Sequence, residues 1–334
     1  MLFGWFVLVI ILVAYSLGLD RTFLVDQQNY LQNFAQAPTL GWLDRFSDRD
    51  ASLLSRLVAL FTEEFLWQVW ATALGSVLSP PTSVVVTVLT LNVLLALAVV
   101  RLPDPVLPLV IWLILPVGFA VTGLLQLRQG FAFALALYFT LRLNRPVLGL
   151  LLAASIHATF LLAVPFAAIA WFCKRNHLLA IVGSVSLALV AAYLGGVLFE
   201  AFGGRRLKIY NVDQTEATSV LYVFGALLCS LPSLQRLLAP PNSSEPTLLG
   251  QSLASIAVMH IGVVAFVAGS FFMFPLGAGR VGYLVMLLLI PIVPTIQRRD
   301  STLGVSLFAL MVLYLIYLAV KTAIEGTYDV YFAG

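Results

Sequence analysis

The chain carries little charge for its length. Only 10% of its 334 residues are Asp, Glu, Lys or Arg, and 61% are hydrophobic. A soluble protein carries roughly 25% charged residues, so this composition excludes an ordinary soluble domain. Apolar stretches long enough to span a bilayer recur from Leu2 to Val320. The sequence therefore predicts an all-α, polytopic transmembrane helix bundle.

Residues that hold metals or nucleotides are also scarce. The only two cysteines, Cys173 and Cys229, lie in or beside apolar segments and lack C-x-x-C spacing. The chain has no H-x-x-x-H pair, no Asp-rich cluster and no phosphate-cradling glycine loop. We therefore expect no metal and no cofactor. The net charge of +3 gives no reason to expect nucleic acid as a partner.

Apolar runs between polar breaks predict the membrane spans. The predicted fold is one integral membrane domain over residues 1–334 with about 9–11 membrane segments. The predicted spans lie near 2–19, 82–100, 106–126, 130–143, 178–199, 218–238, 249–272, 281–296 and 302–320.

Two polar regions between these spans are predicted to lie on the outer face. Residues 20–64 are expected to form a polar loop, and residues 200–217 a second one. An apolar stretch near 52–78 holds the acidic pair Glu63-Glu64. That mixture is typical of an amphipathic helix at the membrane interface rather than of a span.

The segment from Pro146 to Cys173 has an unusual length. Its 28 residues exceed the roughly 20 that one span needs and fall short of two spans. Basic residues flank it on both sides, which favours cytoplasmic ends under the positive-inside rule. We therefore predict a re-entrant or half-helix pair near 147–172 that turns near His157, at the floor of an outward-facing cavity.

Arg128 interrupts the apolar run LLQLRQGFAFALALY at residues 124–138. The segment that follows it, 130–143, would be about 21 Å long as a helix, short of the roughly 30 Å hydrocarbon core. We expect Arg128 to be drawn into an outward-facing cavity for this reason. Arg280 opens another short span on the same side. Two guanidinium groups are well matched to the oxygens of a diphosphate.

Several motifs resemble those of one family. Arg128-Gln129 begins R-Q-x-x-A-x-A, and S-I-H-A-T follows at 155–159. An R-x-x-x-x-D-x-x-N-Y motif spans Arg21–Tyr30, and the tail contains TYDVYF. Together with Glu63-Glu64 and Arg280 near Tyr283, these motifs resemble the EpsG family of Wzy-like exopolysaccharide and O-antigen polymerases of bacterial inner membranes. The resemblance covers nearly the whole chain.

The resemblance implies a GT-C-like membrane glycosyltransferase. Such enzymes join glycan repeat units carried on polyprenyl diphosphate, at the membrane face towards the periplasm or cell exterior. A sugar hydroxyl of one lipid-linked unit attacks the anomeric carbon of another, and polyprenyl diphosphate leaves. The implied partners are the lipid-linked oligosaccharide and membrane lipid, with a chain-length regulator and a flippase as protein partners.

The candidate site residues follow from both lines of reasoning. His157 is a candidate base or a group that orients the acceptor hydroxyl, and Glu63 and Glu64 are rival bases. The same two glutamates would also suit the acidic face of an interfacial helix. The predicted substrate-binding residues are Arg128, Gln129, Arg280, Asp26, Asn29, Tyr30, Arg205, Arg206, Tyr210 and Tyr283.

The basic run EAFGGRRLKIY, which carries Arg205, Arg206 and Tyr210, has two interpretations. It is either a solvated loop or a contact for an anionic ligand. The whole chain also has an alternative function, as a secondary transporter or flippase for lipid-linked sugars. Internal repeats are common in transporters, and we find none that echoes the Arg128–His157 unit.

Overall fold

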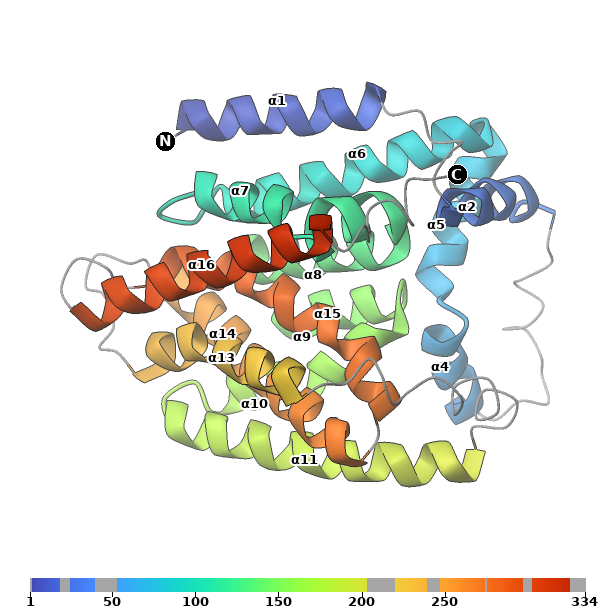
Figure 1. The fold of residues 1–334 in the computed structure, drawn as a ribbon. Helices are drawn as coiled ribbons and strands as arrows, with labels where there is room; N and C mark the ends of the chain where they lie inside the picture. Colours follow the sequence, from blue (N-terminus) through green and yellow to red (C-terminus); the bar gives the residue numbers. More distant parts are fainter. Residues whose placement is uncertain are drawn as a thin grey trace. The chain divides into compact units, whose positions relative to one another are not determined.

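The computed structural model describes residues 2–18, 25–39, 53–202, 220–238, 247–273, 275–296 and 302–324 (Figure 1). Within these ranges the chain forms helices joined by turns, and no residue lies in a β-strand. The predicted all-α class is therefore confirmed. The side chains of Asp26 and Arg280 lie outside the description, although both residues belong to helices.

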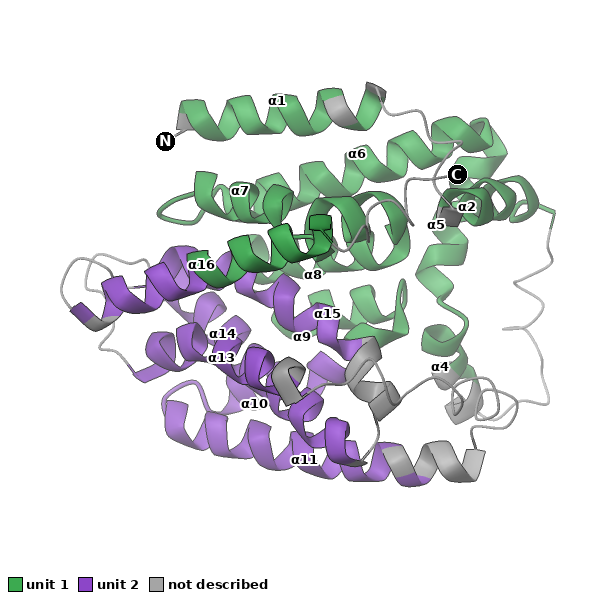
Figure 2. Cartoon of the chain, in the orientation of Figure 1, with its two compact units in different colours: residues 1–161, 312–334 green, residues 162–311 purple. Residues whose placement is uncertain are grey.

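The chain divides into two compact units, 1–161 with 312–334, and 162–311 (Figure 2). The helices of the first unit are α1 (Leu2–Gly18), α2 (Val25–Gln36), α4 (Leu53–Thr62), α5 (Phe65–Val77), α6 (Pro80–Val99), α7 (Val106–Ile114), the π-helix η1 (Val117–Leu125), α8 (Leu127–Leu143) and α9 (Pro146–Ala154).

The second unit contains α10 (Ala163–Phe172), α11 (His177–Phe202), α13 (Val220–Leu238), α14 (Thr247–Met273), α15 (Pro275–Ile292) and η3 (Val293–Thr295). Two helices are shared between the units, the 3₁₀ helix η2 (Ala158–Leu162) and α16 (Thr302–Ile324). The prediction of a single membrane domain is left untested by this division.

Every predicted span coincides with a helix or a helix pair. By length and composition, four of the described helices could cross a membrane: α6, α11, α14 and α16. A fifth is added if the bent pair α7 and η1 counts as one span. The multi-pass character holds, and the larger number of about 9–11 membrane segments stays a prediction.

The predicted span 106–126 coincides with a bent pair rather than one continuous helix, because α7 and η1 meet at a bend of 73°. The cause is Pro116, which cannot donate an amide hydrogen bond and keeps the preceding Leu115 extended, with ψ of 123°. Gly118 follows with a non-helical ψ of −114°. A Cβ atom there would lie 2.3 Å from the Trp112 carbonyl oxygen, so this approach requires glycine.

The region predicted as one amphipathic helix near 52–78 is instead two helices, α4 and α5. The break falls at Glu63-Glu64, where Glu64 adopts a left-handed backbone with φ of 52° that no α-helix continues through. The predicted polar loop 20–64 likewise contains α2 and α4. Its position relative to the membrane is untested.

The unusual segment 146–173 does contain two short helices, α9 and α10, with η2 between them. Nine and ten residues, respectively, are far fewer than the roughly 20 that a span needs. The structure therefore shows two short helices here, whereas their membrane re-entry as a half-helix pair and the cytoplasmic position of both ends stay predictions.

Helix α14 is the centre of the second unit. In the most apolar stretch of α14, 83% is buried inside the structure. The corresponding share is 22% for α11, which packs against α14. Glycines on α14 allow two close helix contacts, since Gly262 lies against the ring of Phe166 on α10 and Gly269 against Leu189 on α11. Small residues at helix contacts are the usual packing device in membranes.

Two polar side chains meet inside the second unit. The Ser233 hydroxyl on α13 and the Nδ1 atom of His260 on α14 lie 2.7 Å apart, and both residues are fully buried. A polar group in an apolar interior costs free energy unless it is hydrogen-bonded. This pair therefore fixes the register of α13 against α14.

Replacing Ser233 with Ala should lower stability by about 1 kcal/mol, because the buried Nδ1 atom of His260 loses its hydrogen bond to the Ser233 hydroxyl. Thermal unfolding of the purified protein in detergent measures the change. Ser230→Ala is the control, since the Ser230 hydroxyl donates only to the Leu227 carbonyl of its own helix and is more exposed. Equal melting temperatures for both variants would contradict the assignment.

Candidate functional site

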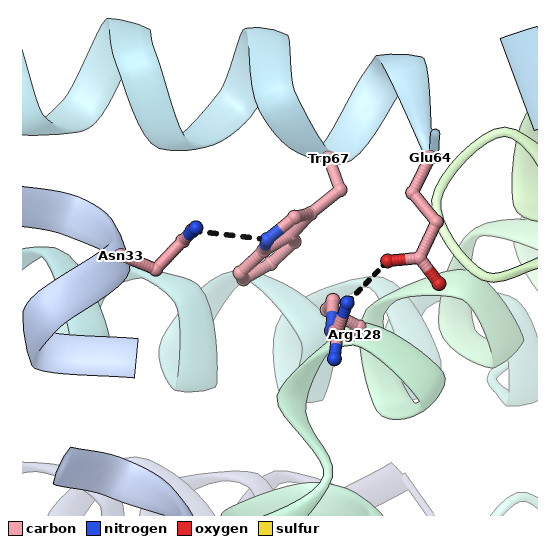
Figure 3. Close-up of polar contacts among 4 residues, drawn as sticks. All are labelled: Asn33, Glu64, Trp67 and Arg128. Carbon is pink, nitrogen blue, oxygen red and sulfur yellow. Dashed lines mark hydrogen bonds and ion pairs between the residues drawn. The ribbon is translucent and has the colours of Figure 1, made fainter. Parts of the chain in front are cut away.

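An ion pair joins two segments of the first unit at the start of α8. Arg128 donates a hydrogen bond from Nη1 to Oε2 of Glu64, which lies between α4 and α5 (Figure 3). Tyr30 on α2 adds a side-chain hydrogen bond to the same guanidinium. Three residues predicted separately from the sequence thus meet at one place.

The backbone before α8 sets the position of Arg128. The helix η1 ends at Leu125, and Gln126 takes a non-helical conformation with φ −95° and ψ 64° before α8 begins. Two residues after Arg128, Gly130 packs directly on η1, where a Cβ atom would lie 2.1 Å from the Thr122 carbonyl oxygen. The backbone of Arg128 is therefore held at a fixed place beside η1.

The break between α4 and α5 positions the two glutamates differently. Glu63 is exposed, whereas the Glu64 side chain is only 17% exposed and faces Arg128. Burial raises the pKa of the Glu64 carboxyl, and the Arg128 guanidinium lowers the pKa against that effect, leaving it above its ordinary value. A carboxylate with such a pKa is a stronger base than one in water.

A buried tryptophan supports this corner. Trp67, one turn after Glu64, donates from Nε1 to Oδ1 of Asn33 on α2 over 3.1 Å (Figure 3). Its ring also packs on Tyr30 and Phe34, each with ring centroids 5.7 Å away. Since Tyr30 and Glu64 both contact Arg128, Trp67 fixes both partners of the guanidinium at once.

The turn that carries His157 is attached to the same corner. The amide of Leu66 donates to the Ser155 carbonyl over 2.9 Å, so the start of α5 is bonded to the end of α9. Leu66 lies two residues after Glu64, and Ser155 lies two residues before His157. His157 is half-buried and packs edge-on against Phe160.

The exposure of these side chains determines what they can bind. The Arg128 side chain is 43% exposed despite its ion pair. A guanidinium has five N–H donors in a planar fork, which is more than the contacts with Glu64 and Tyr30 use. This corner presents a positioned cation, a carboxylate and an imidazole from three adjacent segments.

The other predicted site residues are placed as follows. Gln129 is buried and Asn29 is exposed on α2, while Tyr283 on α15 of the second unit is 36% exposed. The side chains of Asp26 and Arg280, and residues Arg205, Arg206 and Tyr210, lie outside the described part of the chain. The joint binding of a diphosphate by Arg128 and Arg280 stays a prediction.

The sequence reasoning missed the residues that hold this corner together. Asn33 and Trp67 bond to each other, and Gln27 donates to the Leu124 carbonyl on η1 over 3.0 Å. A helical spacing of three residues places Gln27, Tyr30 and Asn33 on one face of α2, which was a usable signal. The described residues contain no cluster of three or more His, Cys, Asp or Glu that could hold a metal.

An all-helical chain with several apolar helices long enough to cross a membrane is a multi-pass membrane protein. The chain belongs to the EpsG family, whose model matches residues 3–331. This confirms the resemblance seen in the motifs. The family suggests a polysaccharide polymerase-like role of the glycosyltransferase type. No curated protein and no solved structure matched the chain.

Gly130→Ala should displace α8 from η1 and move Arg128, because the added methyl group meets backbone rather than a flexible side chain. We expect a loss of about 1–3 kcal/mol in stability from overpacking and a lower polymerisation rate. Thermal unfolding and a turnover assay check both. Gly183→Ala is the matched control, since its Cβ would meet only Ile169 at an ordinary 3.6 Å. A tolerated Gly130→Ala variant would show that η1 does not fix Arg128.

Proposed function

We propose that this protein is a glycan polymerase that uses a polyprenyl-diphosphate-linked oligosaccharide as donor and a second such molecule as acceptor. The proposal places it in a bacterial inner membrane, with the site towards the periplasm or cell exterior. The observation that carries the proposal is the Arg128 guanidinium, anchored by Glu64 and Tyr30 yet 43% exposed. EpsG membership supports the same class of reaction.

Arg128 is proposed to bind the diphosphate of the donor. The bond between the anomeric carbon and the diphosphate oxygen breaks in the reaction, so negative charge grows on the leaving group. A guanidinium that is already held in place stabilises this charge without having to reorganise. Its fork also matches two phosphate oxygens at once, which an ammonium group cannot do.

His157 is proposed to orient the acceptor sugar. Its imidazole is half-buried in the turn after α9, and the bond between Leu66 and Ser155 holds this turn beside Glu64. A sugar hydroxyl that bonds to the imidazole would approach from the side of that turn. Donor and acceptor would then be recognised by adjacent but separate groups.

Arg128→Ala and Arg128→Lys should both reduce polymerisation by about 10²–10³-fold. Alanine removes the N–H groups that bind the diphosphate, and lysine lacks the planar fork of the guanidinium. Purified enzyme with one lipid-linked repeat unit should form a ladder of longer products, which a gel resolves. Arg101→Lys is the control, since Arg101 is exposed and donates only to the Arg142 carbonyl. A fully active Arg128→Lys variant would show that charge alone suffices.

The ladder also tests the class of function. A transporter or flippase moves its lipid-linked substrate without lengthening the glycan. Wild-type protein that binds the lipid-linked repeat but makes no ladder would therefore overturn the polymerase proposal.

His157→Ala should lower kcat/KM for the acceptor about tenfold, equivalent to about 1.4 kcal/mol of lost contact. Affinity for polyprenyl diphosphate should stay near that of the wild type, because Arg128 is unchanged. Steady-state rates at varied acceptor and a separate binding titration make the two measurements. His157→Gln keeps a donor and an acceptor and should recover part of the loss. Weakened diphosphate binding in both variants would place His157 on the donor side instead.

A further inference from the structure

We propose that the Glu64 carboxylate occupies the place of a substrate phosphate oxygen on Arg128, and becomes the base for the acceptor hydroxyl once the donor diphosphate displaces it. This inference rests on the proposed function and adds to it the regulation of the site. It assigns Glu64 two successive roles, as a stand-in anion and then as a proton acceptor.

The geometry of the ion pair supports the first role. Only Oε2 of Glu64 bonds to the guanidinium, and it does so through Nη1 alone. A single-point contact uses part of the fork, whereas a diphosphate can engage two N–H groups in parallel. The diphosphate also carries more negative charge than one carboxylate. It therefore competes effectively for the same guanidinium.

The location of Glu64 makes the exchange possible. It lies in the two-residue break between α4 and α5, outside either helix, in a left-handed backbone conformation. Its side chain can change rotamer there without disturbing a helical hydrogen bond. Tyr30 and the Trp67–Asn33 bond continue to hold the surrounding helices. Arg128 thus keeps a fixed position while its anionic partner changes.

Displacement prepares Glu64 for the second role. While Arg128 and Glu64 are paired, the guanidinium stabilises the ionised carboxylate. The carboxylate is therefore a weaker base. When the diphosphate neutralises Arg128, that stabilisation is withdrawn inside a half-buried site. The carboxylate then holds a proton more strongly. Its affinity for a proton rises only when the donor is bound.

The proposed glycan transfer forms one bond and breaks one at the anomeric carbon of the donor. The acceptor hydroxyl oxygen forms a bond to the anomeric carbon of the donor, and its proton passes to the Glu64 carboxylate. The anomeric carbon–oxygen bond breaks, and polyprenyl diphosphate leaves with the electron pair, held by Arg128. After the product moves on, Glu64 releases its proton to solvent and pairs with Arg128 again. When no donor is bound, Glu64 stays paired with Arg128 and does not act as a base.

The test compares wild type, Glu64→Gln and Glu63→Gln in lipid nanodiscs. Each protein is titrated with polyprenyl diphosphate that carries no sugar, followed by calorimetry, and is assayed with the lipid-linked repeat. The amide in Glu64→Gln keeps the size of the side chain and still accepts a hydrogen bond, so the fold should survive. Glu63→Gln removes the same charge from the adjacent exposed carboxyl and is the matched control.

Glu64→Gln should bind polyprenyl diphosphate about fivefold or more tightly, because the competing anion is gone. It should also lose about 10²-fold or more in turnover, because the base is gone. Glu63→Gln should change the affinity far less, since an exposed charge is screened by solvent. This combination of tighter binding with lost turnover is not produced by simple unfolding.

Three other outcomes would overturn the inference about Glu64 without overturning the proposed polymerase function. If the wild type is active and Glu64→Gln binds polyprenyl diphosphate more weakly, Glu64 is a positioning residue for Arg128. Tighter binding with full turnover would pass the base role to another group. Equal tightening in both variants would reflect overall charge. Only failure of the wild type to extend the glycan would overturn the polymerase proposal itself.

Discussion

The bond between Arg128 and Glu64 is the interaction on which the site depends. A guanidinium cannot lose its proton, so in an apolar helix bundle it must find an anion or reach water. Here it does both, pairing with one carboxylate while a large part of its side chain stays accessible. This accessible charge is the reason why Arg128 is proposed to bind a substrate anion.

The surrounding fold serves to hold that pair in one place. The π-helical η1 and the close contact of Gly130 with Thr122 fix the start of α8. Trp67 is bonded to Asn33 and packed on Tyr30, and so fixes the opposite side. Rigid backbone contacts on one side and an aromatic cluster on the other leave Glu64, in its break between helices, as the adjustable group.

Composition and long apolar runs were enough to predict the helical class and the position of the apolar helices, but not α2 and α4, which lie in the predicted polar loop 20–64. The bend at Pro116 and the helix break at Glu64 were not predicted, because both depend on local backbone conformation that a hydropathy pattern does not record. Arg128 was found because charge is conspicuous in an apolar run. Its pairing with Glu64, 64 positions away, depends on tertiary packing and was not predictable from spacing, whereas the shared face of Tyr30 and Asn33 on α2 was.

The amide of Leu66 bonded to the Ser155 carbonyl has a consequence for how such proteins diverge. The turn after α9 and the corner at Glu64 share a main-chain bond, so neither segment can shift without carrying the other. If the turn at 155–157 recognises the acceptor as proposed, a chain that moved its backbone there would also have to move the backbone of 63–66. In related chains, residues 63–66 and 155–157 should therefore change together rather than independently.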